Sequence, residues 1–230
     1  MFQMVWVWVV SLPVTLLNSP KVASYLQPSF GTASDIVGVI IYAVGLCMES
    51  WSDIQKYRFR SAHKDDKGAI CDVGLFSWSR HPNYFGEIII QFAIYMIAVS
   101  PAAEGYVHGG ARAALYASVV GAVFLTILLM FISGLPLQER PGAKKRYENG
   151  TRWDTYAEYL RRTSILIPFP PQLYASMPVF LKRTLFCEFP MYVFDPAKHA
   201  DQDKMRQRNS EDGFGDESVD EGGQGRQSAG

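Results

Sequence analysis

Residues 113–135, which read AALYASVVGAVFLTILLMFISGL, form a run of 23 positions without a charged side chain. A helix needs about 20 predominantly apolar residues to cross the hydrocarbon core of a bilayer, so this run is long enough to span one. Three further stretches, residues 1–17, 32–48 and 85–99, contain at most one charged residue each. Together the four stretches predict an all-α, multi-pass transmembrane helical bundle of about four spans.

Charge is distributed unevenly, although the 230 residues have a formal net charge of zero. The first 194 residues carry 17 basic and 13 acidic side chains, which is about 15% of that part, against roughly 25% in soluble domains. A soluble enzyme is therefore disfavoured, and residues 1–195 are predicted to form the membrane domain. Residues 196–230 are rich in Gly, Ser, Gln and acidic residues and poor in large apolar ones, which predicts a disordered acidic tail.

The basic residues of the first 194 gather in alternate loops. Fifteen of the 17 lie either between the second and third apolar stretches or after the fourth, and the other two loops hold only Lys21 and Arg112. This is the positive-inside pattern, so both termini are predicted to be cytosolic. The same pattern explains the basic loops without a nucleic-acid partner.

The N-terminal stretch has neither a basic region ahead of it nor a clear cleavage site, and Pro13 interrupts it, so it is not a standard signal peptide. An N-terminally shortened membrane protein is one interpretation of this beginning.

The three cysteines, Cys47, Cys71 and Cys187, are far apart, with no CxxC pair and no cluster at metal-ligand spacing. They are predicted to be free thiols, and no metal site is expected.

Charged residues follow the second apolar stretch at helical spacing. Asp53, Lys56 and Arg60 stand at i, i+3 and i+7, so they share one helical face if the helix continues beyond the membrane. Cations at the end of a helix also suit the negative end of its dipole. The three residues form either a basic collar at the membrane surface or one side of a binding site.

The block Trp78-Ser79-Arg80-His81-Pro82-Asn83-Tyr84-Phe85-Gly86-Glu87 precedes the third apolar stretch. Pro82 favours the first turn of a helix, which puts Arg80 and His81 just ahead of the helix N-terminus. Backbone N–H groups point outward there, so the sequence predicts an anion site, with phosphate as the expected anion.

A polar stripe continues along this helix, because Asn83, Glu87 and Gln91 recur every four residues. Polar groups on a spanning helix normally face the bundle interior or a water-filled cavity. They indicate either a functional site or a structural hydrogen bond from Glu87 to a neighbouring element.

Tyr156, Tyr159 and Thr163 are predicted to share one face of a short helix after the last apolar stretch, with Arg162 beside them. Tyrosine hydroxyls near cations can bind a cofactor or donate a proton, but they can equally form an interfacial aromatic belt. The spacing leaves both interpretations open. Residues 173–180 are predicted to form a short interfacial helix.

Several nucleotide-binding and hydrolase motifs are absent from the sequence: GxGxxG after a strand, GxxxxGK[ST], HExxH and GxSxG. A soluble Rossmann or P-loop site is excluded on this basis. A nucleotide cofactor would have to bind between helices and basic loops.

Four motifs occur in an order that is shared with a known family: Asp53-x-x-Lys56-x-x-x-Arg60, the block 78–87, Ser133-Gly134-x-Pro136-Leu-x-Glu139 and Tyr156-x-x-Tyr159-x-Arg161-Arg162-Thr163. On these motifs the chain, over about residues 1–196, resembles the family of unknown-function membrane proteins related to the steroid 5α-reductase C-terminal domain. The wider superfamily is similar and includes sterol C14 and C24 reductases, isoprenylcysteine carboxyl methyltransferase and phospholipid methyltransferases.

The resemblance implies a helical bundle of the endoplasmic reticulum with a cytosol-facing cofactor pocket and further membrane helices ahead of residues 1–17. Reductase members use NADPH and methyltransferase members use S-adenosylmethionine. Glu87 and Tyr159 would lie nearest the substrate as catalytic residues, and Trp78 and Tyr84 would line the ring or ribose pocket. The remaining cofactor-binding residues implied by the matching motifs are Asp53, Lys56, Arg60, Arg80, His81, Asn83 and Arg162.

The expected function is reduction of a C=C bond in a sterol-like or other apolar lipid with NADPH, with Tyr159 or Glu87 polarising or protonating the substrate. The alternatives are an S-adenosylmethionine-dependent lipid or prenyl methyltransferase and a non-catalytic, truncated membrane protein. NADPH needs several cationic donors for its phosphates, whereas S-adenosylmethionine presents one carboxylate and a sulfonium. Convergence of the four cations Lys56, Arg60, Arg80 and Arg162 would therefore favour NADPH.

Overall fold

The computed structural model describes residues 2–66, 68–201 and 204. Three helices in these ranges are long and apolar enough to cross a membrane: α4 (Ala33–Ala62), α5 (Pro82–Ala103) and the continuous helical run Gly109–Glu148. The chain is therefore an all-helical integral membrane protein in the part that the structure describes. Its extended pairing there is confined to an isolated parallel bridge between Ser79 and Ser164.

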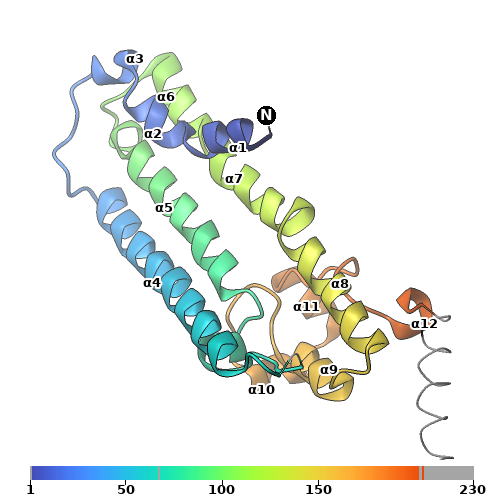
Figure 1. Ribbon diagram of the computed structural model, residues 1–230. Helices are drawn as coiled ribbons and strands as arrows, with labels where there is room; N and C mark the ends of the chain where they lie inside the picture. The colour runs from blue at the N-terminus through green and yellow to red at the C-terminus, as the bar shows by residue number, and fades with distance from the viewer. Residues whose placement is uncertain (1, 67, 202–203, 205–230) are drawn as a thin grey trace, which may run out of the picture.

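The first predicted span forms two short helices instead of one long one. Helix α1 (Phe2–Val10) and helix α2 (Leu12–Leu17) meet at Ser11, and α3 (Pro20–Ala23) follows. Pro13 lies in the first turn of α2, where its missing N–H group is tolerated. At 1.5 Å per residue neither helix can cross a core about 30 Å thick. Helix α1 lies across the bundle against α7, while α2 packs on α5 and α6 (Figure 1).

Helices α4 and α5 lie side by side and make the most extensive helix–helix contact (Figure 1). Small residues permit this approach: a Cβ on Gly86 would come within 2.9 Å of the backbone of α4, at the nitrogen of Glu49 and the oxygen of Gly45. Close backbone packing through small residues is the usual way in which membrane helices associate. Helix α4 begins with a capping box between Thr32 and Asp35. It continues beyond its apolar part to Ala62, which is the condition for Asp53, Lys56 and Arg60 to share one helical face.

The third long helix changes from apolar to polar along its length and contains a π-helical turn. It comprises α6 (Gly109–Ala117), α7 (Val120–Ile127), the π-helical turn η2 (Leu128–Ile132) and the polar α8 (Leu135–Glu148). Gly134 joins η2 to α8, and a Cβ at this position would lie 2.2 Å from the carbonyl oxygen of Leu129. Glycine is therefore required at this junction, and π-turns of this kind are frequent beside functional sites.

The remaining elements gather at the end of the bundle opposite α1, α2 and α3 (Figure 1). They are η1 (Gly74–Ser77), α9 (Trp153–Arg162), α10 (Pro171–Ser176), α11 (Val179–Leu185) and α12 (Pro196–His199). The interfacial helix predicted at residues 173–180 is thus two helices, because Pro178 follows the end of α10. The first residues of the predicted tail form α12, which is capped by Asp195, and most of that tail lies outside the described residues.

Candidate functional site

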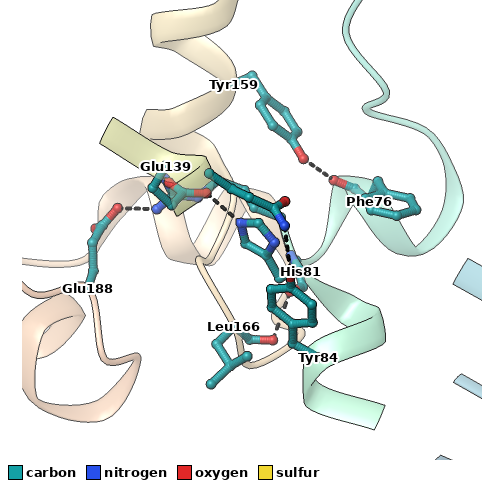
Figure 2. Close-up of polar contacts among 10 residues, drawn as sticks. Phe76, His81, Tyr84, Glu139, Tyr159, Leu166 and Glu188 are labelled. Atoms are coloured by element: carbon teal, nitrogen blue, oxygen red, sulfur yellow. Dashed lines mark hydrogen bonds and ion pairs between the residues drawn. The ribbon is translucent and has the colours of Figure 1, made fainter. Parts of the chain in front are cut away.

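A buried network of charged side chains lies at the start of α5. The Arg80 guanidinium pairs with Glu139 of α8 and with Glu188, which follows α11 (Figure 2). Nε2 of His81 lies 2.6 Å from a carboxylate oxygen of Glu139. The side chains of Arg80 and Glu139 are only 6% and 5% exposed, whereas that of Glu188 is 17% exposed. Glu139 is therefore the buried carboxylate that contacts both Arg80 and His81, and Glu188 is the more solvent-accessible carboxylate of the network.

Backbone contacts hold Arg80 and His81 in this position. Pro82 is the first residue of α5 and His81 its N-cap, as the sequence predicts. The Arg80 N–H donates to the carbonyl of Ser164 over 2.8 Å, and the Ser79 hydroxyl donates to the carbonyl of Leu166 over 2.7 Å. The segment that follows α9 therefore runs beside residues 78–80 and keeps the side chains of Arg80 and His81 turned into the protein.

Electrostatics in this network favour the charged form of Arg80. Burial by itself would lower the pKa of Arg80, but the carboxylates of Glu139 and Glu188 outweigh it and raise that pKa above its ordinary value. Both terminal nitrogens of the guanidinium are committed to these carboxylates, and its buried Nε has no partner in the part of the chain that the structure describes. Arg80 is thus paired with two carboxylates and does not form an open anion site.

Three tyrosines adjoin the network. The Tyr159 hydroxyl donates to the Phe76 carbonyl over 2.9 Å (Figure 2). The Tyr174 hydroxyl donates to Glu188 over 2.8 Å. Burial raises the pKa of both tyrosines above the usual range. Tyr84 stacks on His81, with ring centroids 5.2 Å apart, and its hydroxyl accepts a hydrogen bond from Gln138. Of the three hydroxyls, that of Tyr84 accepts a hydrogen bond, and no acceptor for its proton is found in the part of the chain that the structure describes.

The other cations whose convergence with Arg80 would favour NADPH lie near the segment between α4 and α5. Lys56 lies 5.9 Å from the centre of the Phe76 ring, and Arg162 pairs with Asp72 over 2.7 Å at a half-exposed position. Asp53 and Arg60 are exposed on α4. Among the described residues, Lys56 and Arg162 thus contact other groups than Arg80 does. Trp78 is 47% exposed at the edge of η1.

The polar stripe of α5 lies on the inward side of the bundle. Oδ1 of Asn83 and Oε1 of Gln91 are buried without a hydrogen-bond partner among the described residues. Glu87 lines a cavity of about 240 Å³, whose other walls come from α1, α7 and η2. The cavity is otherwise formed by Gln3, Trp6, Leu125, Leu128, Leu129 and Ser133. An ionised carboxyl group in such apolar surroundings costs free energy because it loses its hydration, and such groups usually have a functional role.

A second cavity, of about 410 Å³, opens beside the Arg80–Glu188 pair. Its lining includes four basic residues, Arg80, Arg161, Lys182 and Arg183, and one acidic residue, Glu188. The Arg161 guanidinium also pairs with Glu158 over 2.7 Å. We call this cavity the cationic cavity. Residues of α9, α11 and the segment 192–194, including Trp153, Leu160, Val179, Tyr192 and Phe194, form its apolar walls.

Lys182 is the most deeply placed of these cations after Arg80. Its ammonium group donates to the Arg161 carbonyl over 3.0 Å and lies 4.3 Å from the centre of the Tyr174 ring. Burial lowers the pKa of Lys182. Two of its three N–H groups have no hydrogen-bond acceptor recorded in the described residues, so they can donate to a ligand.

Sequence reasoning identified Arg80 and His81 but missed the residues that complete the cationic cavity. In the sequence, Lys182 and Arg183 contribute only to the positive-inside pattern. No motif around Glu188 marks it as a functional residue. Glu139 belonged to one of the recognised motifs, but its two partners are 58 and 59 residues away in sequence. Within the described residues, no group of three or more His, Cys, Asp or Glu side chains could hold a metal ion, and all three cysteines are free.

These features define a helical membrane protein with a buried ionic network, two members of which line a cationic cavity. The chain belongs to the family described as protein of unknown function DUF1295, whose family model matches residues 1–163. The match includes the long helices and the pairing of Arg80 and His81 with Glu139, and it ends before Lys182 and Glu188. No curated protein and no solved structure matches the chain.

Proposed function

We propose that this protein is a membrane oxidoreductase that reduces a C=C bond of a sterol-like or other apolar lipid with NADPH. The observation that carries the proposal is the cationic cavity, whose lining includes four basic residues and one acidic residue. Arg80 and Arg161 already pair with carboxylates, so Lys182 and Arg183 are the basic residues proposed to meet a ligand first. The proposed relationship to the steroid 5α-reductase C-terminal domain rests on the four motifs quoted above. The lipid substrate is proposed from the membrane helices and from the apolar cavity at Glu87.

The residues of the cationic cavity fit the phosphates of NADPH. Arginine and lysine donors are the usual partners of phosphate oxygens, and a volume of about 410 Å³ lies within the range of ligand sites. Trp153 and Tyr192 offer aromatic surfaces for a base or ribose. S-adenosylmethionine carries a single carboxylate and a positive sulfonium, so a cavity with this excess of cations suits it less well. We therefore favour NADPH.

The ionic network supports a division between a cofactor side and a substrate side. It runs from Glu188 at the cationic cavity through Arg80 and Glu139 to His81, on which Tyr84 stacks. Tyr84 in turn lies close enough to Glu87 to interact with it electrostatically. The network thus joins the surroundings of the two cavities and can fix their relative positions.

When bound, NADPH would supply the hydride, which requires its nicotinamide to reach the lipid while its phosphates stay in the cationic cavity. The side chains of this protein would orient the lipid and hold the proton. Glu87 lines the apolar cavity and is the proposed proton donor, assisted by Tyr84, whose O–H is free to donate. Tyr159 was expected to share this role. Because its buried hydroxyl already donates to the Phe76 carbonyl, we assign it the positioning of η1 instead.

We propose that the end of the bundle with α9, α10 and α11 faces the cytosol, since the loops that hold 15 of the 17 basic residues lie there. The endoplasmic reticulum is proposed on the resemblance alone. A cytosolic N-terminus required residues 1–17 to be a fourth span. Helices α1 and α2 are short and lie at the opposite end, so we place the N-terminal segment on the far side of the membrane (Figure 1).

Thermal unfolding of the detergent-purified protein with NADPH, NADH or S-adenosylmethionine tests the cofactor. NADPH is expected to raise the midpoint by several degrees, because binding to the folded state alone stabilises it. A Lys182→Gln/Arg183→Gln variant should lose most of this shift. Stabilisation by S-adenosylmethionine alone would establish the methyltransferase alternative, and a response to neither compound would favour the non-catalytic one.

A further inference from the structure

Glu188 holds a special position in the cationic cavity, because it is the one acidic residue among the described residues that line it. One of its carboxylate oxygens pairs with Arg80, and the other accepts the hydrogen bond from Tyr174. The other carboxylate partner of Arg80, Glu139, is more deeply buried and does not line the cavity. Glu188 therefore stands between Arg80 and any ligand that enters.

A carboxylate and a phosphate make the same kind of contact with arginine, through oxygens that accept from the terminal nitrogens of the guanidinium. The Glu188 oxygen thus occupies the position on Arg80 that a phosphate oxygen would take. It also lies close enough to Lys182 to interact with that cation. While Glu188 stays in place, an incoming anion meets cations whose charge is already partly offset, and it is repelled by the carboxylate.

The chain around Glu188 is suited to local rearrangement. Glu188 lies between α11 and α12, outside any helix, and follows Cys187, whose φ of 58° is unusual for a residue with a side chain. Its backbone N–H donates to the Lys182 carbonyl over 3.1 Å, so the main chain stays attached to α11 if the side chain turns away. The exchange therefore needs a movement of one side chain and no change of fold.

We propose that Glu188 is an internal anion that competes with a ligand phosphate for Arg80, and so determines how strongly the cationic cavity selects doubly charged phosphates over weaker anions. On binding, Arg80 keeps Glu139 and exchanges Glu188 for a phosphate oxygen, while Lys182 contacts the same phosphate. The identity of the natural ligand rests on the proposed function. The competition itself concerns any phosphate-bearing ligand.

The test is calorimetric titration of the full chain in detergent with inorganic pyrophosphate. A Glu188→Gln variant, whose amide oxygen can still accept from Arg80, should bind pyrophosphate about tenfold or more tightly than the parent, since one opposing charge at contact distance is removed. The matched control is Asp154→Asn, which removes the same charge from an exposed position on α9 outside the lining. Its affinity should stay within about twofold of the parent.

A second variant keeps the test decisive if Glu188→Gln does not fold. Tyr174→Phe removes the hydrogen bond that holds the second oxygen of Glu188 and leaves every charge in place. It should tighten pyrophosphate binding by about two- to fivefold, since a neutral hydrogen bond contributes modestly. Unchanged or weaker binding in the folded variants, or an equal gain in Asp154→Asn, would overturn the proposal, as would absence of pyrophosphate binding in all variants.

Failure of the proposed function has a different signature. If NADPH neither binds nor stabilises the protein, while pyrophosphate binds and Glu188→Gln tightens it, the competition at Arg80 stands and the cofactor assignment falls. If NADPH binds equally well to the parent and to both variants, the cofactor assignment stands and the role of Glu188 is refuted.

Discussion

Replacement of Arg80 by methionine tests whether the network at the start of α5 stabilises the fold. Arg80→Met removes the cation between Glu139 and Glu188 and replaces it with an apolar side chain of similar length. Two carboxylates are left facing each other, one of them 5% exposed and the other 17% exposed. Breaking a buried ion pair from one side costs about 3–5 kcal/mol, because the remaining charge stays buried without compensation.

This cost predicts a large fall in thermal stability. In a domain of this size about 1 kcal/mol corresponds to about 2–4 °C, so the midpoint of Arg80→Met should fall by about 6–20 °C. Arg162→Met is the matched control, because Arg162 also forms one arginine–carboxylate pair, with Asp72, but both side chains are about two-fifths exposed. An exposed pair contributes about 0–1 kcal/mol, so its midpoint should fall by at most about 4 °C.

A third variant separates the charge effect from the packing effect. Arg80→Met/Glu139→Gln/Glu188→Gln removes the uncompensated charges together with the cation, and it should recover most of the loss. The assay is thermal unfolding in detergent at neutral pH, followed by circular dichroism. If Arg80→Met falls no further than Arg162→Met, or if the triple variant recovers nothing, the network does not act as a buried ionic cluster.

Three further predictions concern other parts of the molecule. Gly86→Ala should lower the midpoint by several degrees, because its Cβ would meet the α4 backbone at 2.9 Å, whereas Gly142→Ala on α8, with nothing within 4 Å, should leave the midpoint unchanged or raise it. Burial raises the pKa of Tyr192 to about 12, so the folded state holds this proton longer than the unfolded state, and stability must fall as the pH rises from 10 to 12. Tyr192→Phe should show a smaller fall over that range in urea unfolding, and an equal fall would contradict the assignment. Glu87→Gln should keep the midpoint within about 2 °C and reduce NADPH-dependent lipid reduction by about 100-fold, and activity within twofold of the parent would exclude Glu87 as the proton donor.

The spanning helices could be predicted from sequence because an apolar run of about 20 residues is a local property. The run at residues 113–135 lies within the third long helix, and α4 and α5 contain the stretches predicted at 32–48 and 85–99. The difference at residues 1–17, where two short helices form instead of one long helix, has an equally local cause. Apolar content alone cannot distinguish one long helix from two short ones. In the structure the helix is interrupted at Ser11, two residues before Pro13, and two short helices result.

Part of the candidate site could also be predicted from the sequence. The block 78–87 predicted a helix that begins at Pro82 and a functional role for Arg80 and His81 ahead of it, and the helix begins there. The same local reasoning predicted an open anion site, because a helix N-terminus attracts anions. In the structure the Arg80 guanidinium is already paired with two carboxylates from distant parts of the chain.

Sequence by itself determined the membrane character of this protein, the position of its charged end and the residues at the start of α5, since each depends on composition or on spacing within a few helical turns. Only the tertiary structure decided what those residues contact. Glu139 and Glu188 lie 59 and 108 residues from Arg80, and the basic residues of α9 and α11 meet them at one cavity. Charge acts through distance in space, and the folded chain alone sets that distance.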